Sequence, residues 1–244
     1  MTARPGLREP LLAFAAATVL AALLAQVAAA APFVRDNLHV GIAVIFFYAP
    51  SVAARLSKRP FDYRTAGLTV APVGLNLRVL GAALGITFPL FLAGFFLFYG
   101  QVCGPHGAAV SRWFGPLCTR WVGLSGGHLA LPPSFILLAL NQLIVIAIPE
   151  ELFFRGYLLG RLEERWPSRA RFLGAPVGWA LLVSSLLFAL GHLVVVPSLP
   201  RLAVFFPALV FGWMRARTGS IAAGAAFHAL CNLFSDVLHT SFFR

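Results

Sequence analysis

Long apolar blocks divide the chain and limit what it can fold into. They cover residues 11–33, 39–54, 79–102, 134–148, 173–196, 202–214 and 220–239, and the fourth continues as a helix towards Arg165. Only 11% of the residues are charged, against about 25% in soluble domains. Most blocks approach the ~20 residues that a helix needs to cross a bilayer, and they exceed the ~10-residue strands of a barrel. The sequence therefore predicts an all-α, polytopic transmembrane helical bundle of about seven spans.

We expect a single membrane domain with two parts. Residues 1–133 hold the N-terminal transmembrane spans and an outer loop, and residues 134–244 hold the predicted catalytic core. In the loop, Cys103 and Cys118 either pair in an oxidising compartment or remain free thiols. Cys231, inside the last block, is interpreted as a small core residue.

The net charge of +11 comes from arginines between the apolar blocks. If the N-terminus is cytoplasmic, fourteen of the 19 Lys and Arg residues lie on the inner side. The other five are Arg35, Arg112, Arg120, Arg201 and Arg244. This bias follows the positive-inside rule, so we expect a cytoplasmic N-terminus and a lipid bilayer, not nucleic acid, as the partner of the basic residues. A single lysine beside abundant Arg, Ala and Gly favours a GC-rich bacterial source, and hence the bacterial inner membrane.

Two of the eight acidic residues, Glu150 and Glu151, lie side by side at the end of an apolar run. Ionisable groups at membrane depth are costly and by default indicate a functional site. Adjacent helical residues point ~100° apart, whereas Arg155 lies one turn from Glu151 on the same face. We therefore predict that Glu151 pairs with Arg155 and that Glu150 faces a reaction centre, with Pro149 able to kink the helix. The alternative is that these charges only mark the solvated end of a span.

Two later blocks carry further polar side chains. His192 follows Phe188 by four residues, and His228 and Asn232 share a helical face at i, i+4. Each alone is compatible with interhelical hydrogen bonding for packing. Together with a carboxylate they can activate water and stabilise an oxyanion. Zinc held by Glu150, His192 and His228 is the lesser alternative, because the H-E-x-x-H pattern is absent.

Three short motifs, taken in order, resemble those of one known family. They are Glu-Glu-x-x-x-Arg at 150–155, Phe-x-x-x-His at 188–192 and His-x-x-x-Asn at 228–232. The sequence from about 134 to 234 resembles the CAAX-protease and bacteriocin-processing (CPBP) intramembrane endopeptidases. The resemblance implies three pairs of roles: water activation by Glu150 and His192, oxyanion binding by His228 and Asn232, and support by Glu151 and Arg155.

The resemblance also implies a membrane-anchored protein or peptide as substrate. We expect no cofactor, although the resemblance leaves a metal open. For a bacterial chain we expect cleavage of a C-terminal sorting tail or a leader peptide. One alternative is a non-catalytic immunity or scaffold protein on the same fold. Another is a transporter, which the lack of an internal repeat disfavours.

A count of helical rise places Glu150 and His192, which we expect to activate water together, at different depths in the membrane. At ~1.5 Å per residue, Glu150 lies about 24 Å from Ser134 and near the inner face. His192 lies about 28 Å from Leu173 and near the outer face. Tilt, a kink at Pro149 or a later start of the fifth block near Gly178 would each bring them closer. Of these, we expect the start of the fifth block to lie later than the apolar pattern indicates.

Overall fold

The computed structural model describes residues 6–104 and 118–243. Arg4, Arg112 and Arg244, which contribute to the topology prediction, lie outside these ranges. In the first half, the helices are α1 (Arg8–Ala30), α2 (Pro32–Asp36), α3 (Leu38–Leu56), α4 (Val73–Val102) and the single turn α6 (Gly123–Gly126). The first half therefore supplies three long helices to the bundle.

The second half begins with one continuous helical rod, from Phe135 to Arg165. Its segments are α7 (Phe135–Leu140), the π-helix η1 (Asn141–Ala147), α8 (Ile148–Glu151), the π-helix η2 (Leu152–Leu158) and α9 (Leu159–Arg165). A short antiparallel hairpin follows, β1 (Ala170–Phe172) and β2 (Ala175–Val177). The chain ends with α10 (Trp179–Val195), the 3-10 helix η3 (Leu199–Val204), α11 (Phe205–Thr218) and α12 (Ala222–Phe242).

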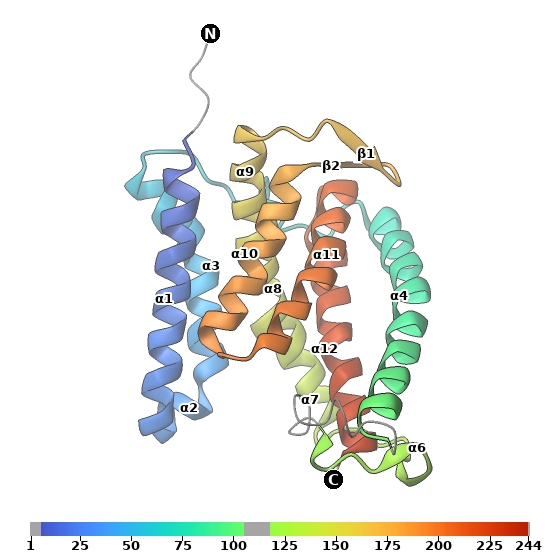
Figure 1. Cartoon of the computed structure of the whole chain (residues 1–244). Coiled ribbons are helices and arrows are strands. Elements are labelled where there is room, and N and C mark those ends of the chain that lie inside the picture. The colour runs from blue at the N-terminus through green and yellow to red at the C-terminus, as the bar shows by residue number, and fades with distance from the viewer. Residues whose placement is uncertain (1–5, 105–117, 244) are drawn as a thin grey trace.

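Five helical segments are long and apolar enough to cross a membrane: α1, α3, α4, the rod at 135–165 and the segment at 199–218. α10, with 17 residues, is shorter, and α12 carries several polar residues. The start of α1 and the end of α12 lie at opposite ends of the bundle (Figure 1), as an odd number of crossings requires. The predicted all-α, polytopic membrane bundle is confirmed. The number of spans and their direction stay predictions.

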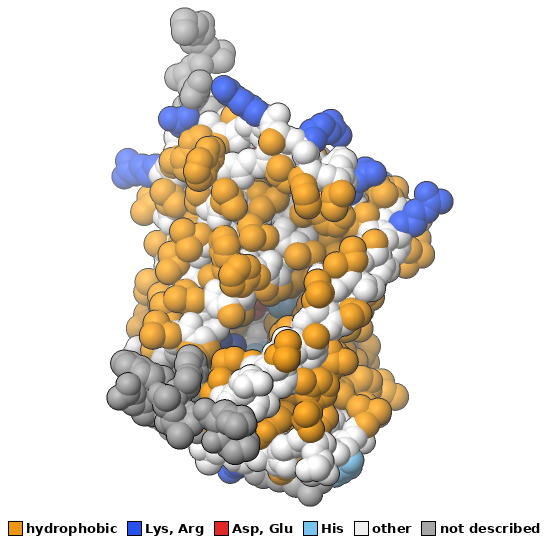
Figure 2. Space-filling view, turned by 45° about the vertical axis from the view of Figure 1, so that its right-hand side comes forward, with side chains coloured by type: hydrophobic (Ala, Val, Ile, Leu, Met, Phe, Trp, Pro, Cys, Tyr) orange, Lys and Arg blue, Asp and Glu red, His pale blue; other side chains and the backbone are white. Residues whose placement is uncertain are grey.

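The outer surface fits a lipid environment. Large apolar side chains project from the sides of the bundle, and Val19, Leu20 and Leu23 of α1 are each more than half exposed. Lys and Arg side chains gather at the end where α1 begins (Figure 2). An apolar belt with basic residues at one end is what the positive-inside pattern requires of a membrane bundle.

The fifth apolar block does not begin where the sequence pattern placed it. Residues 173–177 form the turn and second strand of the hairpin, and α10 begins at Trp179 with Gly178 as its N-cap. Gly174 adopts a positive φ of 79°, which a right-handed helix does not allow. Pro176 has no backbone N–H that could bond to a carbonyl of a preceding helical turn. The later start near Gly178 is thus confirmed. His192 then lies about 20 Å along α10, which also slants across the bundle (Figure 1).

The outer loop is fastened to the end of α12. Cys103 and Cys118 form a disulfide with their Cα atoms 5.4 Å apart, so of the two alternatives the paired state is observed. Trp121 stacks on Tyr99 and Phe242, and the Val122 amide donates to the Phe242 carbonyl over 3.1 Å. These contacts place residues 118–122 at the end of the bundle opposite the basic one.

A cluster of charges at the basic end ties three segments together. We call it the end cluster: Glu9, Arg59, Arg161 and Glu164. Glu9 binds Arg59 over 2.7 Å and Arg161 over 3.2 Å, and both arginines also bind Glu164. Burial acts to lower the pKa of the Arg59 guanidinium, but its hydrogen bonds to Glu164 and Glu9 outweigh burial and raise it. The cluster links α1, the segment after α3 and α9.

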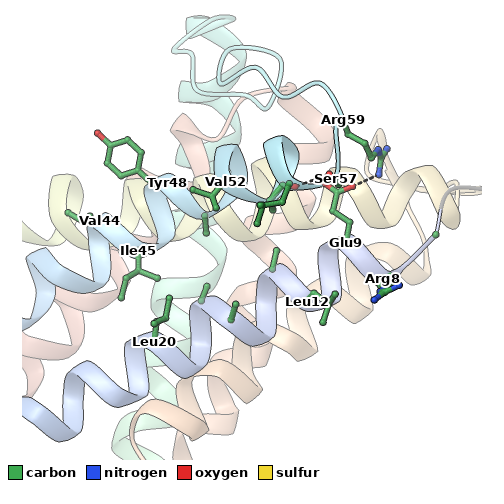
Figure 3. A pocket seen from close by; sticks show the side chains of 17 residues that line it. Arg8, Glu9, Leu12, Leu20, Val44, Ile45, Tyr48, Val52, Ser57 and Arg59 are labelled. Atoms are coloured by element: carbon green, nitrogen blue, oxygen red, sulfur yellow. Dashed lines mark hydrogen bonds and ion pairs between the residues drawn. The ribbon is translucent and has the colours of Figure 1, made fainter.

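Beside the end cluster, α1 and α3 enclose an apolar groove of about 1040 Å³. Alanines such as Ala13 and Ala17 line it, with larger side chains such as Leu20 and Val52 (Figure 3). Its charged groups, including Glu9 and Arg59, gather at one end with Ser57, whereas Tyr48 lies farther along the groove (Figure 3). Most of the groove is therefore a surface for apolar contacts, not for acid–base chemistry.

Candidate active site

The rod from Phe135 to Arg165 presents the two predicted glutamates between two π-helical segments. Glu150 and Glu151 end the short α8, with η1 before them and η2 after them. A π-helical turn bonds i to i+5, so it changes which faces the following side chains occupy, and such turns are frequent at functional sites. Every residue of η2 is buried, so this part of the rod runs through the centre of the bundle.

Glu151 is the fully buried member of the pair. Its Oε1 atom lies 3.2 Å from Arg155 Nη1 and 3.2 Å from His228 Nδ1. The side chains of Glu151 and Arg155 are 0% and 1% exposed. Removing one partner from such a pair leaves an uncompensated charge and costs about 3–5 kcal/mol. We call Glu150, Glu151, Arg155 and His228 the central cluster.

Aromatic rings enclose the guanidinium of Arg155. Its Cζ atom lies 4.2 Å from the centroid of Phe188 and 5.0 Å from that of Phe211. Nη2 donates to the carbonyl of Ala208 over 3.3 Å. Ring faces attract cations, so the aromatic contacts and the ion pair together hold the charge away from water. Arg155 therefore connects the rod to α10 and α11 and lies behind the carboxylates.

Glu150 faces the other way, into a cavity of about 570 Å³. Its side chain is 13% exposed, and its Oε2 atom lies 3.8 Å from His228 Nε2. Within the part of the chain that the structure describes, this oxygen accepts no hydrogen bond. Figure 2 shows atoms of acidic and histidine side chains at the bottom of a hollow in an otherwise apolar face. Oε2 itself is buried, but the Glu150 carboxylate has spare hydrogen-bonding capacity and its side chain borders the cavity.

His228 lies between the two glutamates and is held by ring stacking. The ring is parallel to Phe211 within 15°, at a centroid distance of 4.8 Å, and is 5.9 Å from Phe188 in an edge-on arrangement. Nδ1 points to Glu151 and Nε2 to Glu150. The imidazole can therefore interact with both carboxylates without moving.

His192 also lines the cavity, but it does not bond to either glutamate. Its Nδ1 atom lies 2.9 Å from the carbonyl of Phe188, one turn earlier on α10. That bond directs Nε2 away from its own helix. The turn between α10 and α11 lies partway along the bundle and not at its end (Figure 1), which keeps His192 near the middle of the molecule.

Asn232 completes the predicted set and brings two residues that sequence reasoning missed. Its Nδ2 atom donates to Gln142 Oε1 over 2.8 Å, and Gln142 Nε2 donates to Asp236 Oδ2 over 3.3 Å. All three side chains line the same cavity as Glu150 and His192. The available signals were the break that Gln142 makes in its apolar run and the i, i+4 spacing of Asn232 and Asp236.

Small residues bring α12 close to the carboxylates. A Cβ atom on Gly224 would lie 3.3 Å from Glu151 Oε2 and 3.6 Å from the carbonyl of Phe211. Gly191, beside His192, faces the side chains of Phe14, Thr18 and Phe154. Of these two glycines, Gly224 is therefore the one that makes room at the central cluster.

The donors do not form a ready metal site. Across residues 6–104 and 118–243, no group of three or more His, Cys, Asp or Glu side chains is placed to hold a metal ion. Glu150 and His228 approach each other, whereas Nδ1 of His192 is bonded to its own helix. Glu150, His192 and His228 therefore do not fit a preformed zinc centre, and metal dependence stays an untested prediction.

The arrangement as a whole combines an available carboxylate, two imidazoles and an amide in a polar cavity inside a helical bundle. These features define a multi-pass membrane protein with a polar cavity between its helices. Residues 132–234 match the family described as Rce1-like, type II CAAX prenyl endopeptidase. The match confirms the predicted resemblance for this segment and supports a CAAX-type intramembrane protease at the family level.

The matched segment contains all three motifs, and the first 131 residues lie outside it. Comparisons with curated proteins and with solved structures returned no match. The match therefore supports a protease at the family level, and this family implies a lipid bilayer as surroundings and a peptide or protein as substrate. It leaves the role of each residue to be tested.

Proposed function

We propose that the protein is an endopeptidase of the bacterial inner membrane in which Glu150 activates water. The observation that supports this is the division between the two glutamates. Glu151 is 0% exposed between Arg155 and His228, whereas Glu150 is 13% exposed and lines the cavity. A general base must reach its water, and of the two glutamates only Glu150 lines the cavity.

The proposed reaction needs one water and one peptide bond. Glu150 takes a proton from the water as its oxygen attacks the peptide carbonyl carbon, which gives a tetrahedral oxyanion. Asn232 donates an N–H to that oxyanion, and His192 helps to move the proton to the leaving nitrogen. As the C–N bond breaks, the amine leaves with the proton, and the carboxylic acid remains with the oxygen of water.

His228 stabilises the same tetrahedral oxyanion by carrying a positive charge. If Nδ1–H donates to Glu151, the ring can donate from Nε2 to the oxyanion only when both nitrogens carry protons. Before Glu150 takes the proton from water, the central cluster then holds two carboxylates, one guanidinium and one imidazolium. Its net charge is zero, which lowers the cost of keeping four ionised groups inside the bundle.

The proposed substrate is a membrane-anchored protein or peptide, cleaved near a C-terminal sorting tail or a leader peptide. Mass spectrometry of membrane proteins should find uncleaved segments in cells that lack the gene. Wild-type protein should remove them, and Glu150→Gln should not. Rescue by Glu150→Gln would instead support the alternative, a non-catalytic immunity or scaffold protein.

The proposed orientation has the N-terminus in the cytoplasm. It follows from the basic residues that gather at the end where α1 begins. Alkaline phosphatase fused after Arg244 should be active, because this enzyme folds only outside the cytoplasm. A fusion active only as a cytoplasmic reporter would reverse the orientation and place the cavity on the other side.

A further inference from the structure

Gln142 is one of two adjacent polar residues that interrupt an apolar run, and the proposed mechanism does not use it. It lies in η1, about two turns before Glu150, and is half-buried. Its amide makes two hydrogen bonds to α12, accepting from Asn232 over 2.8 Å and donating to Asp236 over 3.3 Å. The three side chains form a chain of bonds along one wall of the cavity.

The direction of this chain is set at its far end. An ionised carboxylate only accepts hydrogen bonds, so Asp236 requires the amino group of Gln142 to face it. The carbonyl oxygen of Gln142 must then face Asn232, which requires the amino group of Asn232 to face Gln142. Turning either amide over would set two acceptors or two donors against each other and lose a hydrogen bond.

That direction matters for the chemistry at Asn232. An asparagine amino group has two hydrogens, and the bond to Gln142 uses one of them. The second remains for an acceptor in the cavity. A reversed amide would instead present its oxygen, which repels an oxyanion. The amide is thus useful to the reaction in only one of its two orientations.

We propose that Gln142 and Asp236 are positioning residues that hold the amide of Asn232 with its N–H towards the substrate oxyanion. The inference rests on the proposed function, because it assigns these residues to the same peptide hydrolysis. It differs from simple interhelical bonding, since the chain of bonds lines the cavity and its direction is defined by a carboxylate.

The test measures initial rates of purified full-length protein in detergent, on a pool of internally quenched fluorescent peptides of randomised sequence. Gln142→Leu keeps the volume and loses both bonds, so we expect kcat to fall about 10- to 100-fold with KM within about 3-fold. Gln142→Glu can accept from Asn232 but sets a carboxylate against Asp236, so we expect a similar loss. Asn141→Leu, one residue away and outside the cavity lining, is the matched control and should keep the wild-type rate.

The decisive variant is Gln142→Glu combined with Asp236→Asn. In this double variant, the carboxylate at position 142 accepts hydrogen bonds from Asn232 and from the amide at position 236. The bond between positions 142 and 236 is then reversed, and the orientation of Asn232 is restored. We expect kcat to return to within about 5-fold of the wild-type value, a rescue that a merely structural role would not produce. A double variant that folds but is as slow as Gln142→Glu alone would overturn the proposal, as would a wild-type kcat in Gln142→Leu.

Glu150→Gln in the same assay separates this inference from the proposed function. Cleavage that persists in Glu150→Gln would remove the proposed function itself. Cleavage lost in Glu150→Gln but unchanged in Gln142→Leu would leave the function in place and remove only the positioning role.

Discussion

Two clusters in this molecule each combine two glutamates with cationic side chains, and they differ in how completely the carboxylates are bonded. In the end cluster, both oxygens of Glu9 and both oxygens of Glu164 bind Arg59 or Arg161, and Tyr157 adds a bond to Glu9. In the central cluster, Oε2 of Glu150 and Oε2 of Glu151 accept no hydrogen bond from the described residues.

The difference shows that a buried acid beside an arginine does not by itself indicate a site. The end cluster joins three segments and borders a groove whose walls are mainly apolar. The central cluster borders a cavity that also holds His192, Gln142 and Asn232. A carboxylate oxygen that accepts no hydrogen bond and faces other polar groups distinguishes the candidate catalytic cluster from the structural one.

The largest expected effect comes from the same substitution in both clusters. Glu150→Gln should lower the cleavage rate by about 10³-fold or more, because a positioned general base contributes about 10²–10⁴-fold. Its melting temperature should stay near that of the wild type, since glutamine keeps the shape. Glu9→Gln should do the reverse, keeping the rate within about 2-fold and lowering stability by about 1–3 kcal/mol. Equal effects on rate would contradict the distinction between the clusters.

The next effect concerns the support behind the base. Glu151→Gln should destabilise the fold by about 3–5 kcal/mol, because it leaves the guanidinium of Arg155 buried without a counter-charge. Adding Arg155→Met should recover part of that loss, so the double variant should melt above the single one. Thermal unfolding in detergent measures both, and a double variant that loses the sum of the single effects would show that the two residues do not act as a pair.

His192→Ala should affect rate and not stability. We expect a fall of about 10²-fold in kcat, the lower range for a group that transfers protons. The melting temperature should change little, because the only side-chain hydrogen bond described for the imidazole is to the carbonyl of Phe188 in its own helix. Loss of folding with no separate loss of rate would assign His192 to packing.

The smallest expected effect is that of a chelator. Because the described donors form no group suited to a metal ion, EDTA should leave the initial rate within about 2-fold of its starting value. A rate that collapses and returns on addition of Zn²⁺ would favour the metal alternative, with Glu150, His192 and His228 as the first ligands to test.

Sequence reasoning reached the membrane bundle and the facing of the two glutamates because both depend on local periodicity. The i, i+4 spacing places Glu151 beside Arg155, as the structure shows. The hairpin after α9 was missed because residues 173–177 are as apolar as the first turn of a membrane helix. Gly174 and Pro176 favour a turn and a strand there. The bonds of Gln142 could not be predicted, since its partners are 90 and 94 residues away.

The early end of α10 has a consequence for the supply of water. After Val195 the backbone is extended at Val196 and Ser198, at a point partway along the bundle (Figure 1). Non-helical backbone at membrane depth is tolerated only where it is buried in protein or borders a hydrated space. Val196 lines the cavity, and its N–H donates to the carbonyl of His192 over 2.9 Å, so hydration there concerns its own carbonyl group. We therefore expect the break in the helix to be the place where the water consumed by a hydrolase reaches the cavity.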